Sequence, residues 1–93
     1  MSTVTTTRIE LDKPIVLTEP MCAPRVVYVD TEDYNLVVVY VEHHEREGEV
    51  PPTRLELHVT RPGTPVDPPL TFVGGTKTHL SRLWFVYAGE RPA

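Results

Sequence analysis

The side chains most able to do chemistry are two adjacent histidines, His43 and His44, in a run that also contains Glu42, Glu45 and Glu47. Imidazole and carboxylate groups are ligands that zinc and copper accept. Adjacent residues of an extended chain point apart, however, and no His-Glu-x-x-His pattern is present to direct two imidazoles at one ion. We interpret the run as an exposed polar loop. Metal or small-ligand binding at His43 and His44 is the alternative hypothesis.

Nucleophilic catalysis has few candidate residues. The serines are Ser2 and Ser81, and neither lies in a Gly-x-Ser-x-Gly pattern. The single cysteine, Cys22, lies in a proline-bounded connection, where a small buried hydrophobic role is expected. One cysteine also excludes an intramolecular disulfide. We predict that the chain is not an enzyme and that it uses no cofactor.

Composition limits the other classes of function. The chain has 93 residues, of which 40% are hydrophobic and 24% charged, values typical of one folded domain. The net charge is -4, with no basic cluster, so we expect no direct binding of nucleic acid. The N-terminus lacks the pattern of a secretory signal, and no apolar run is long enough to cross a bilayer. We expect a soluble protein without membrane contact, in the cytoplasm or in an assembly built there.

The elements that would position these side chains are strands. Ten prolines, five glycines and the absence of a helix-period stretch predict an all-β fold. We expect a small antiparallel β-sandwich or open barrel of about six to seven short strands. Residues 1–7 are predicted to be a flexible arm, residues 8–88 a single β domain, and residues 89–93 a frayed C-terminus.

The central feature is a predicted β-hairpin over residues 25–42, with a connection at residues 31–35. Side chains alternate between the two faces of a strand. Along residues 36–41 this alternation makes two apolar sets, one of Val37, Val39 and Val41 and the other of Leu36, Val38 and Tyr40. Residues 83–87 are likewise apolar on both faces. In a two-layer sandwich one face of each strand meets water, so both strands leave an apolar set that needs a cover.

We predict that this cover is another protein, which binds the outward sets of the two strands. The predicted interface residues are Val26, Tyr28, Leu36, Val38, Tyr40, Leu83, Phe85 and Tyr87. The sequence leaves open which set of each strand faces outward. The alternative is a cover from within the chain, either the N-terminal arm or the loop at residues 62–69.

Two further segments give register predictions. Residues 54–60 alternate, which places Leu55, Leu57 and Val59 on an inner face. Gly74 and Gly75 indicate a turn, and a three-residue loop at residues 74–76 would place Phe72 opposite Thr78.

No residue pattern in the chain matches a family motif. In general type, a short β chain with a hydroxyl-rich arm and no catalytic set, it resembles accessory subunits of large assemblies, such as virion or tail proteins of bacteriophages. This resemblance implies a structural role. We predict a non-enzymatic interaction module that works as a subunit of a larger assembly, with protein partners that include copies of itself.

Overall fold

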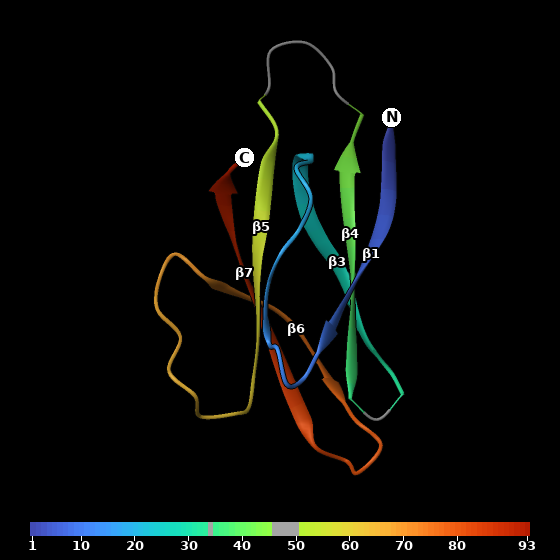
Figure 1. Ribbon diagram of the computed structural model, residues 1–93, viewed down its shortest axis with the longest axis vertical. Helices are drawn as coiled ribbons and strands as arrows, with labels where there is room; N and C mark the ends of the chain where they lie inside the picture. Colours follow the sequence, from blue (N-terminus) through green and yellow to red (C-terminus); the bar gives the residue numbers. More distant parts are fainter. Residues whose placement is uncertain (34, 46–50) are drawn as a thin grey trace.

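The computed structural model describes residues 1–33, 35–45 and 51–93, and within these ranges the chain folds as strands without a helix. The strands are β1 (Ser2–Glu10), β2 (Ile15–Leu17), β3 (Cys22–Glu32), β4 (Leu36–His44), β5 (Thr53–Thr60), β6 (Thr71–Lys77) and β7 (Leu83–Pro92) (Figure 1). The predicted all-β class and the small antiparallel sandwich are confirmed.

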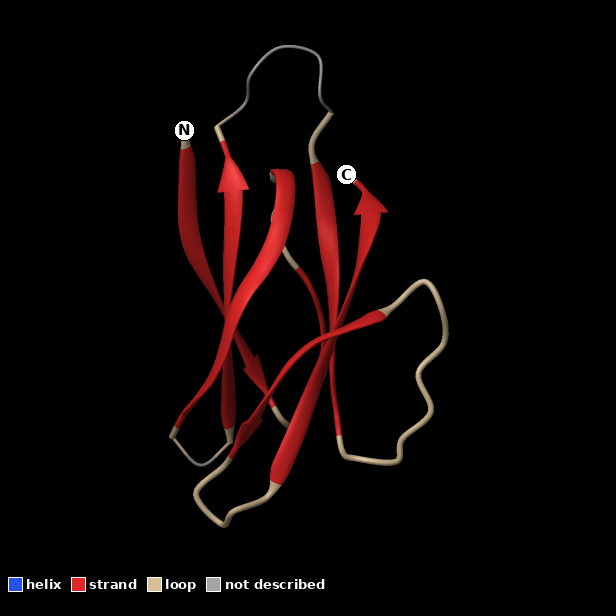
Figure 2. Cartoon of the chain, turned by 180° about the vertical axis from the view of Figure 1, so that it is seen from behind, coloured by secondary structure: helices blue, strands red, loops and turns tan. Residues whose placement is uncertain are grey.

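The strands form two layers that face each other (Figures 1 and 2). One sheet has the order β1-β4-β3, and the other has the order β2-β5-β7-β6. The strand pairs of both sheets are antiparallel. The central hairpin is confirmed, because β3 and β4 pair in register from Glu32 opposite Leu36.

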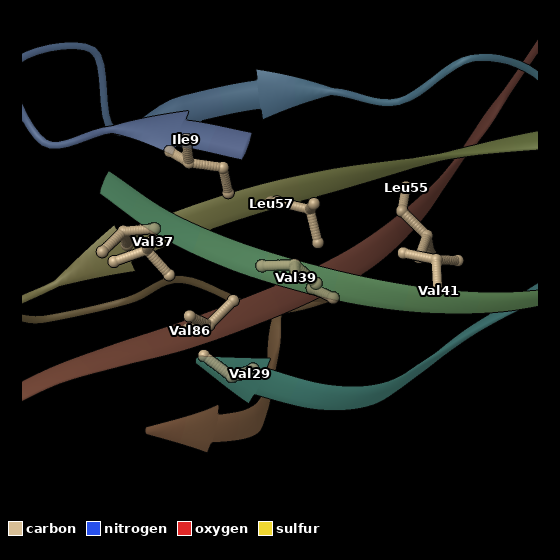
Figure 3. Packing of buried hydrophobic residues seen from close by; sticks show 10 residues of the cluster. Ile9, Val29, Val37, Val39, Val41, Leu55, Leu57 and Val86 are labelled. Atoms are coloured by element: carbon tan, nitrogen blue, oxygen red, sulfur yellow. The ribbon is translucent and has the colours of Figure 1, made fainter. Parts of the chain in front are cut away.

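The core lies between the two sheets and is built from their inner faces (Figure 3). Side chains that alternate along each strand point inward together, as expected for a period of two. The inward set of β4 is Val37, Val39 and Val41, and the inward set of β5 is Leu55, Leu57 and Val59. The three valines are fully buried, and the inward face predicted for residues 54–60 is confirmed.

The second apolar set of β4 points away from the core, and neighbouring strands cover part of it. Val38 is only 2% exposed although it lies on the outer face. Arg8 of β1 and Asp30 of β3 flank it in register, and Arg8 forms a 3.3 Å ion pair with Glu32 across β4. Long polar side chains can bury their stems on apolar surface. The charged neighbours therefore supply the cover that this strand needs.

Both ends of the chain differ from the prediction of loose segments. β1 begins at Ser2 and pairs with β4 along nine residues, and β7 continues to Pro92, which pairs with Thr53. Threonine and valine favour strands. Because β4 extends through His44, the hydroxyl-rich segment has a template to pair with over its whole length.

The predicted turn at Gly74 and Gly75 is wrong, and Phe72 lies opposite Tyr87 rather than Thr78. β6 passes through both glycines, and the chain turns at residues 78–82 instead. A Cβ atom on Gly74 would lie 2.8 Å from Cγ2 of Val29, in the facing sheet. This glycine therefore allows the two sheets to approach closely, a use that sequence alone does not separate from a turn.

Candidate functional site

The outer face of the four-stranded sheet carries a cluster of three aromatic rings, from Phe72 of β6 and from Phe85 and Tyr87 of β7. The ring centroids of Phe72 and Phe85 are 5.5 Å apart, and those of Phe72 and Tyr87 are 5.8 Å apart. Both pairs meet edge to face, which is a favourable arrangement of aromatic rings. Phe72 remains 57% exposed, so the cluster presents apolar surface to the solvent.

A bulge and a glycine place these rings together. The register of β6 with β7 shifts between Phe72 and Gly74, and Val73 between them packs against the core while Phe72 stays on the outer face. Gly75 lies opposite Phe85, and a Cβ atom there would come within 3.1 Å of the Phe85 ring. The missing side chain leaves room for this ring beside Phe72.

A polar cluster of Glu56, His58 and Arg91 lies beside the aromatic cluster on the same face. Glu56 and His58 are two residues apart on β5, so their side chains share a face, and Glu56 Oε2 is 2.6 Å from His58 Nε2. Arg91 of β7 donates from Nε to Glu56 Oε1 at 3.0 Å. The Glu56 carboxylate thus holds a partner on each oxygen, and its side chain is only 20% exposed.

The pKa of the Glu56 carboxyl lies below its ordinary value. The hydrogen bond from Arg91 is the larger cause, and the contact with His58 is the next. Both partners favour the ionised carboxylate over the neutral acid. The carboxylate therefore binds protons less readily in the folded chain than in the unfolded chain.

This shift predicts part of the acid sensitivity of the fold. A carboxyl group with a lowered folded pKa adds stability that is complete above its unfolded pKa and is lost as the pH falls through its folded pKa. We expect Glu56→Gln, which cannot ionise, to lose less stability than the native chain when urea unfolding is measured from neutral pH down to pH about 3. Equal losses in the two proteins would show that the cluster has no such role.

A groove with a volume of about 580 Å³ lies between the polar cluster and the loop at residues 61–70. This loop extends away from β5 to one side of the sheet (Figure 1). Glu56, His58 and Arg91 all line it, together with residues 64–70 of the loop. Leu70 anchors the end of the loop on Gly89, where a Cβ atom would lie 3.1 Å from Leu70 Cδ2. The loop therefore faces the polar cluster.

The structure places seven of the eight predicted interface residues on outer faces. Leu83, Phe85 and Tyr87 lie on the outer face of β7, and Leu36, Val38, Tyr40 and Tyr28 lie on the outer face of the three-stranded sheet. Val26 is the exception, because it pairs with Val41 and packs against the core. A register shift between Val26 and Tyr28 separates their faces, so the placement of Val26 with Tyr28 was wrong.

The outer face of the three-stranded sheet is less apolar than predicted. Val38 is only 2% exposed and lies between its charged neighbours Arg8 and Asp30. The exposed apolar surface there centres on Tyr28, which is 59% exposed and whose ring centroid lies 5.7 Å from that of Tyr40. This face therefore offers one tyrosine pair and the exposed side chain of Val4, beside a part that carries the Arg8–Glu32 ion pair.

His43 and His44 lie at the end of β4 rather than in a loop. Being adjacent on a strand, they point to opposite faces, and His43 is partly buried while His44 is exposed. Nε2 of His43 is buried without a hydrogen-bond partner. Glu47 lies outside the described residues. Among the residues that the structure describes, no three histidine, cysteine or acidic side chains are grouped to hold a metal ion. Ligand binding by the two histidines stays a prediction.

Sequence reasoning missed the polar cluster and the role of Phe72. The alternation of residues 54–60 already placed Glu56 and His58 on one face. Arg91 was the missing partner, since it fell in a segment expected to fray. Phe72 was predicted to lie opposite Thr78, whereas it lies opposite Tyr87, so the contact between the two rings was not predicted.

Comparisons with protein-family models, with curated proteins and with solved structures find no match for this chain. No helix in the described part of the chain could span a membrane.

Proposed function

We propose that this protein is a non-enzymatic interaction module, a subunit of a protein assembly, and that it binds a partner protein through the outer face of the four-stranded sheet. The observation that supports this most is the aromatic cluster of Phe72, Phe85 and Tyr87, with Phe72 57% exposed on an outer sheet face. Burying one such side chain stabilises a complex by about 1.5 to 3 kcal/mol.

The composition of the surrounding face suits a protein interface. Interface centres are enriched in aromatic residues and arginine, and residues of these types dominate measured binding energies. Ile15 and Leu17 of β2 pair with His58 and Glu56, and they are 61% and 51% exposed. Exposed apolar side chains therefore flank the polar cluster on one side, and the aromatic rings lie beyond it. Arg91, held by Glu56, gives this face an oriented cation.

The outer face of the three-stranded sheet is the weaker candidate. The part of this face around Val38 carries Arg8, Asp30 and Glu32, and Arg8 is already paired with Glu32. Charged residues are depleted at interface centres because their desolvation is costly. A partner that docked there would have to displace the ion pair that lies around Val38. On the four-stranded sheet the Arg91–Glu56 ion pair lies beside the aromatic cluster, so a partner can contact the rings without displacing it.

Replacing the apolar side chain of Phe72 with a positively charged one tests the proposal. We expect Phe72→Lys to fold normally, because the side chain is on the outer face, and to lose the partner that the native chain captures from extracts of its source cells. The matched control is Tyr28→Lys, which alters a residue of similar exposure on the opposite sheet. The measurement is quantitative mass spectrometry of captured proteins. Equal capture by all three proteins, or no specific capture by the native chain, would contradict the proposal.

The resemblance to virion and tail accessory subunits names one kind of assembly that would use such a module. That assignment stays a prediction.

A further inference from the structure

The outer edge of β1 belongs to the three-stranded sheet and is separate from the aromatic cluster of the four-stranded sheet. β1 borders the three-stranded sheet, with β4 as its paired neighbour and no described strand on its other side (Figures 1 and 2). Residues 2–6 are all exposed, although they belong to a strand of nine residues. The first half of β1 is therefore held by β4 along one edge, while both of its faces meet solvent.

Two backbone hydrogen bonds at the ends of β1 show which of its backbone groups point outward. The Glu45 amide donates to the Met1 carbonyl at 3.1 Å, and the Leu11 amide donates to the Asn35 carbonyl at 3.0 Å. In an antiparallel pair, alternate residues direct both backbone groups at the partner, and the residues between them direct theirs away. Odd-numbered residues of β1 therefore bond to β4. The outer edge presents the N–H and C=O groups of Ser2, Val4, Thr6, Arg8 and Glu10.

The other sheet edges carry features that hinder the addition of a strand. β3 has two register irregularities and contains Pro24. β2 is only three residues long and lies between Pro14 and Pro20 in the sequence. β6 has a bulge. β1 pairs with β4 without a register shift, and residues 2–7 include neither a charged residue nor a proline. Natural proteins protect exposed edges with short strands, bulges, prolines and charges, because an open edge is a template for pairing. β1 alone among the described edges lacks them over this stretch.

We propose that β1 pairs antiparallel with β1 of a second copy of this chain, about a two-fold axis beside Thr6. This register pairs all nine residues, with Ser2 opposite Glu10 and Val4 opposite Arg8 of the second copy. Every outward N–H and C=O group then meets its complement. Even-numbered residues face even-numbered residues, which keeps the inner faces of both sheets on one side.

The second copy suits this edge because the pairing is self-complementary. A two-fold interface uses the same patch twice, so its contacts must match when the strand is reversed. In this register no like charges lie directly opposite each other, and Thr6 faces Thr6, a cross-strand pair that stabilises sheets. The product is a six-stranded sheet in the order β3-β4-β1-β1-β4-β3.

Substitutions at Thr6 test the edge and the register together. The Thr6 amide points away from β4, so Thr6→Pro removes an outward donor and keeps the bonds to β4. Thr6→Val keeps the amide and is the matched control. Thr6→Lys and Thr6→Glu each place like charges opposite each other, and an equimolar mixture places opposite charges there. Circular dichroism checks that each variant folds, and sedimentation equilibrium gives its mass.

The native chain and Thr6→Val should have twice the 10.5 kDa mass of one chain. Thr6→Pro, Thr6→Lys and Thr6→Glu should each have the mass of one chain, and the mixture of the last two should return to the doubled mass. A native chain that is monomeric at every concentration, or a folded Thr6→Pro that stays dimeric, would overturn the proposal. A mixture that stays monomeric would overturn the axis at Thr6. Phe72→Lys should keep the doubled mass. The dimer of β1 strands can therefore be tested separately from partner binding at the aromatic cluster.

Discussion

Replacing Leu57 with alanine should lower the free energy of unfolding by about 2 to 5 kcal/mol. Leu57 is fully buried on the inner face of β5, within the cluster between the two sheets (Figure 3). The loss combines the transfer of the removed methyl groups with the cavity that they leave. For a domain of this size, whose stability is of the order of 5 to 15 kcal/mol, such a loss is large. Urea unfolding followed by the fluorescence of Trp84 gives the difference.

The control for Leu57 is Leu17→Ala, the same change at a leucine that is 51% exposed on β2. Surface substitutions of this kind usually change stability by less than about 0.5 kcal/mol. Similar losses for the two variants would contradict the assignment of Leu57 to the centre of the core.

Gly74→Ala should destabilise the fold by about 1 to 3 kcal/mol through overpacking. The new methyl group would lie 2.8 Å from Cγ2 of Val29 in the facing sheet, a distance that forces one of the two strands to shift. A turn glycine would instead be sensitive through its backbone conformation, and Gly74 has no positive φ angle.

A double-mutant cycle separates these causes for Gly74. Val29→Ala removes the methyl group that clashes, so it should offset part of the cost of Gly74→Ala. We expect the two substitutions to be coupled by about 0.5 to 3 kcal/mol, whereas independent sites would be additive. Additive losses would show that Gly74 does not mark a contact between the sheets.

Local alternation was sufficient to predict the inward faces of β5 and the two apolar faces of β4, because side-chain direction depends on position along one strand. The pairing register between neighbouring strands was harder to predict from the sequence. The extra residue at Val27 moves Val26 to the core, and the extra residue at Val73 leaves Phe72 outside. A bulge is fixed by the partner strand, which a single strand's pattern does not specify.

The two missed strand ends have the same physical origin. Residues 2–7 carry no large apolar side chain to anchor them, apart from Val4, so their composition indicated a loose arm. Their order comes from backbone hydrogen bonds to β4, which extends three residues beyond Val41. Arg91 was not predicted to belong to a site for the same reason, since it lies in the end of β7 that pairing with β5 orders. Backbone pairing between distant segments leaves no composition signal.

Site-specific photo-crosslinking tests the proposal that the aromatic cluster of the four-stranded sheet binds a partner protein. The photoreactive residue p-benzoylphenylalanine would replace Phe72 in one protein and Tyr28 in another, and both would be irradiated in the source cells. We predict a discrete covalent adduct from position 72, identifiable by mass spectrometry, and none from position 28. The absence of an adduct at position 72, or the same adducts at both positions, would contradict the claim.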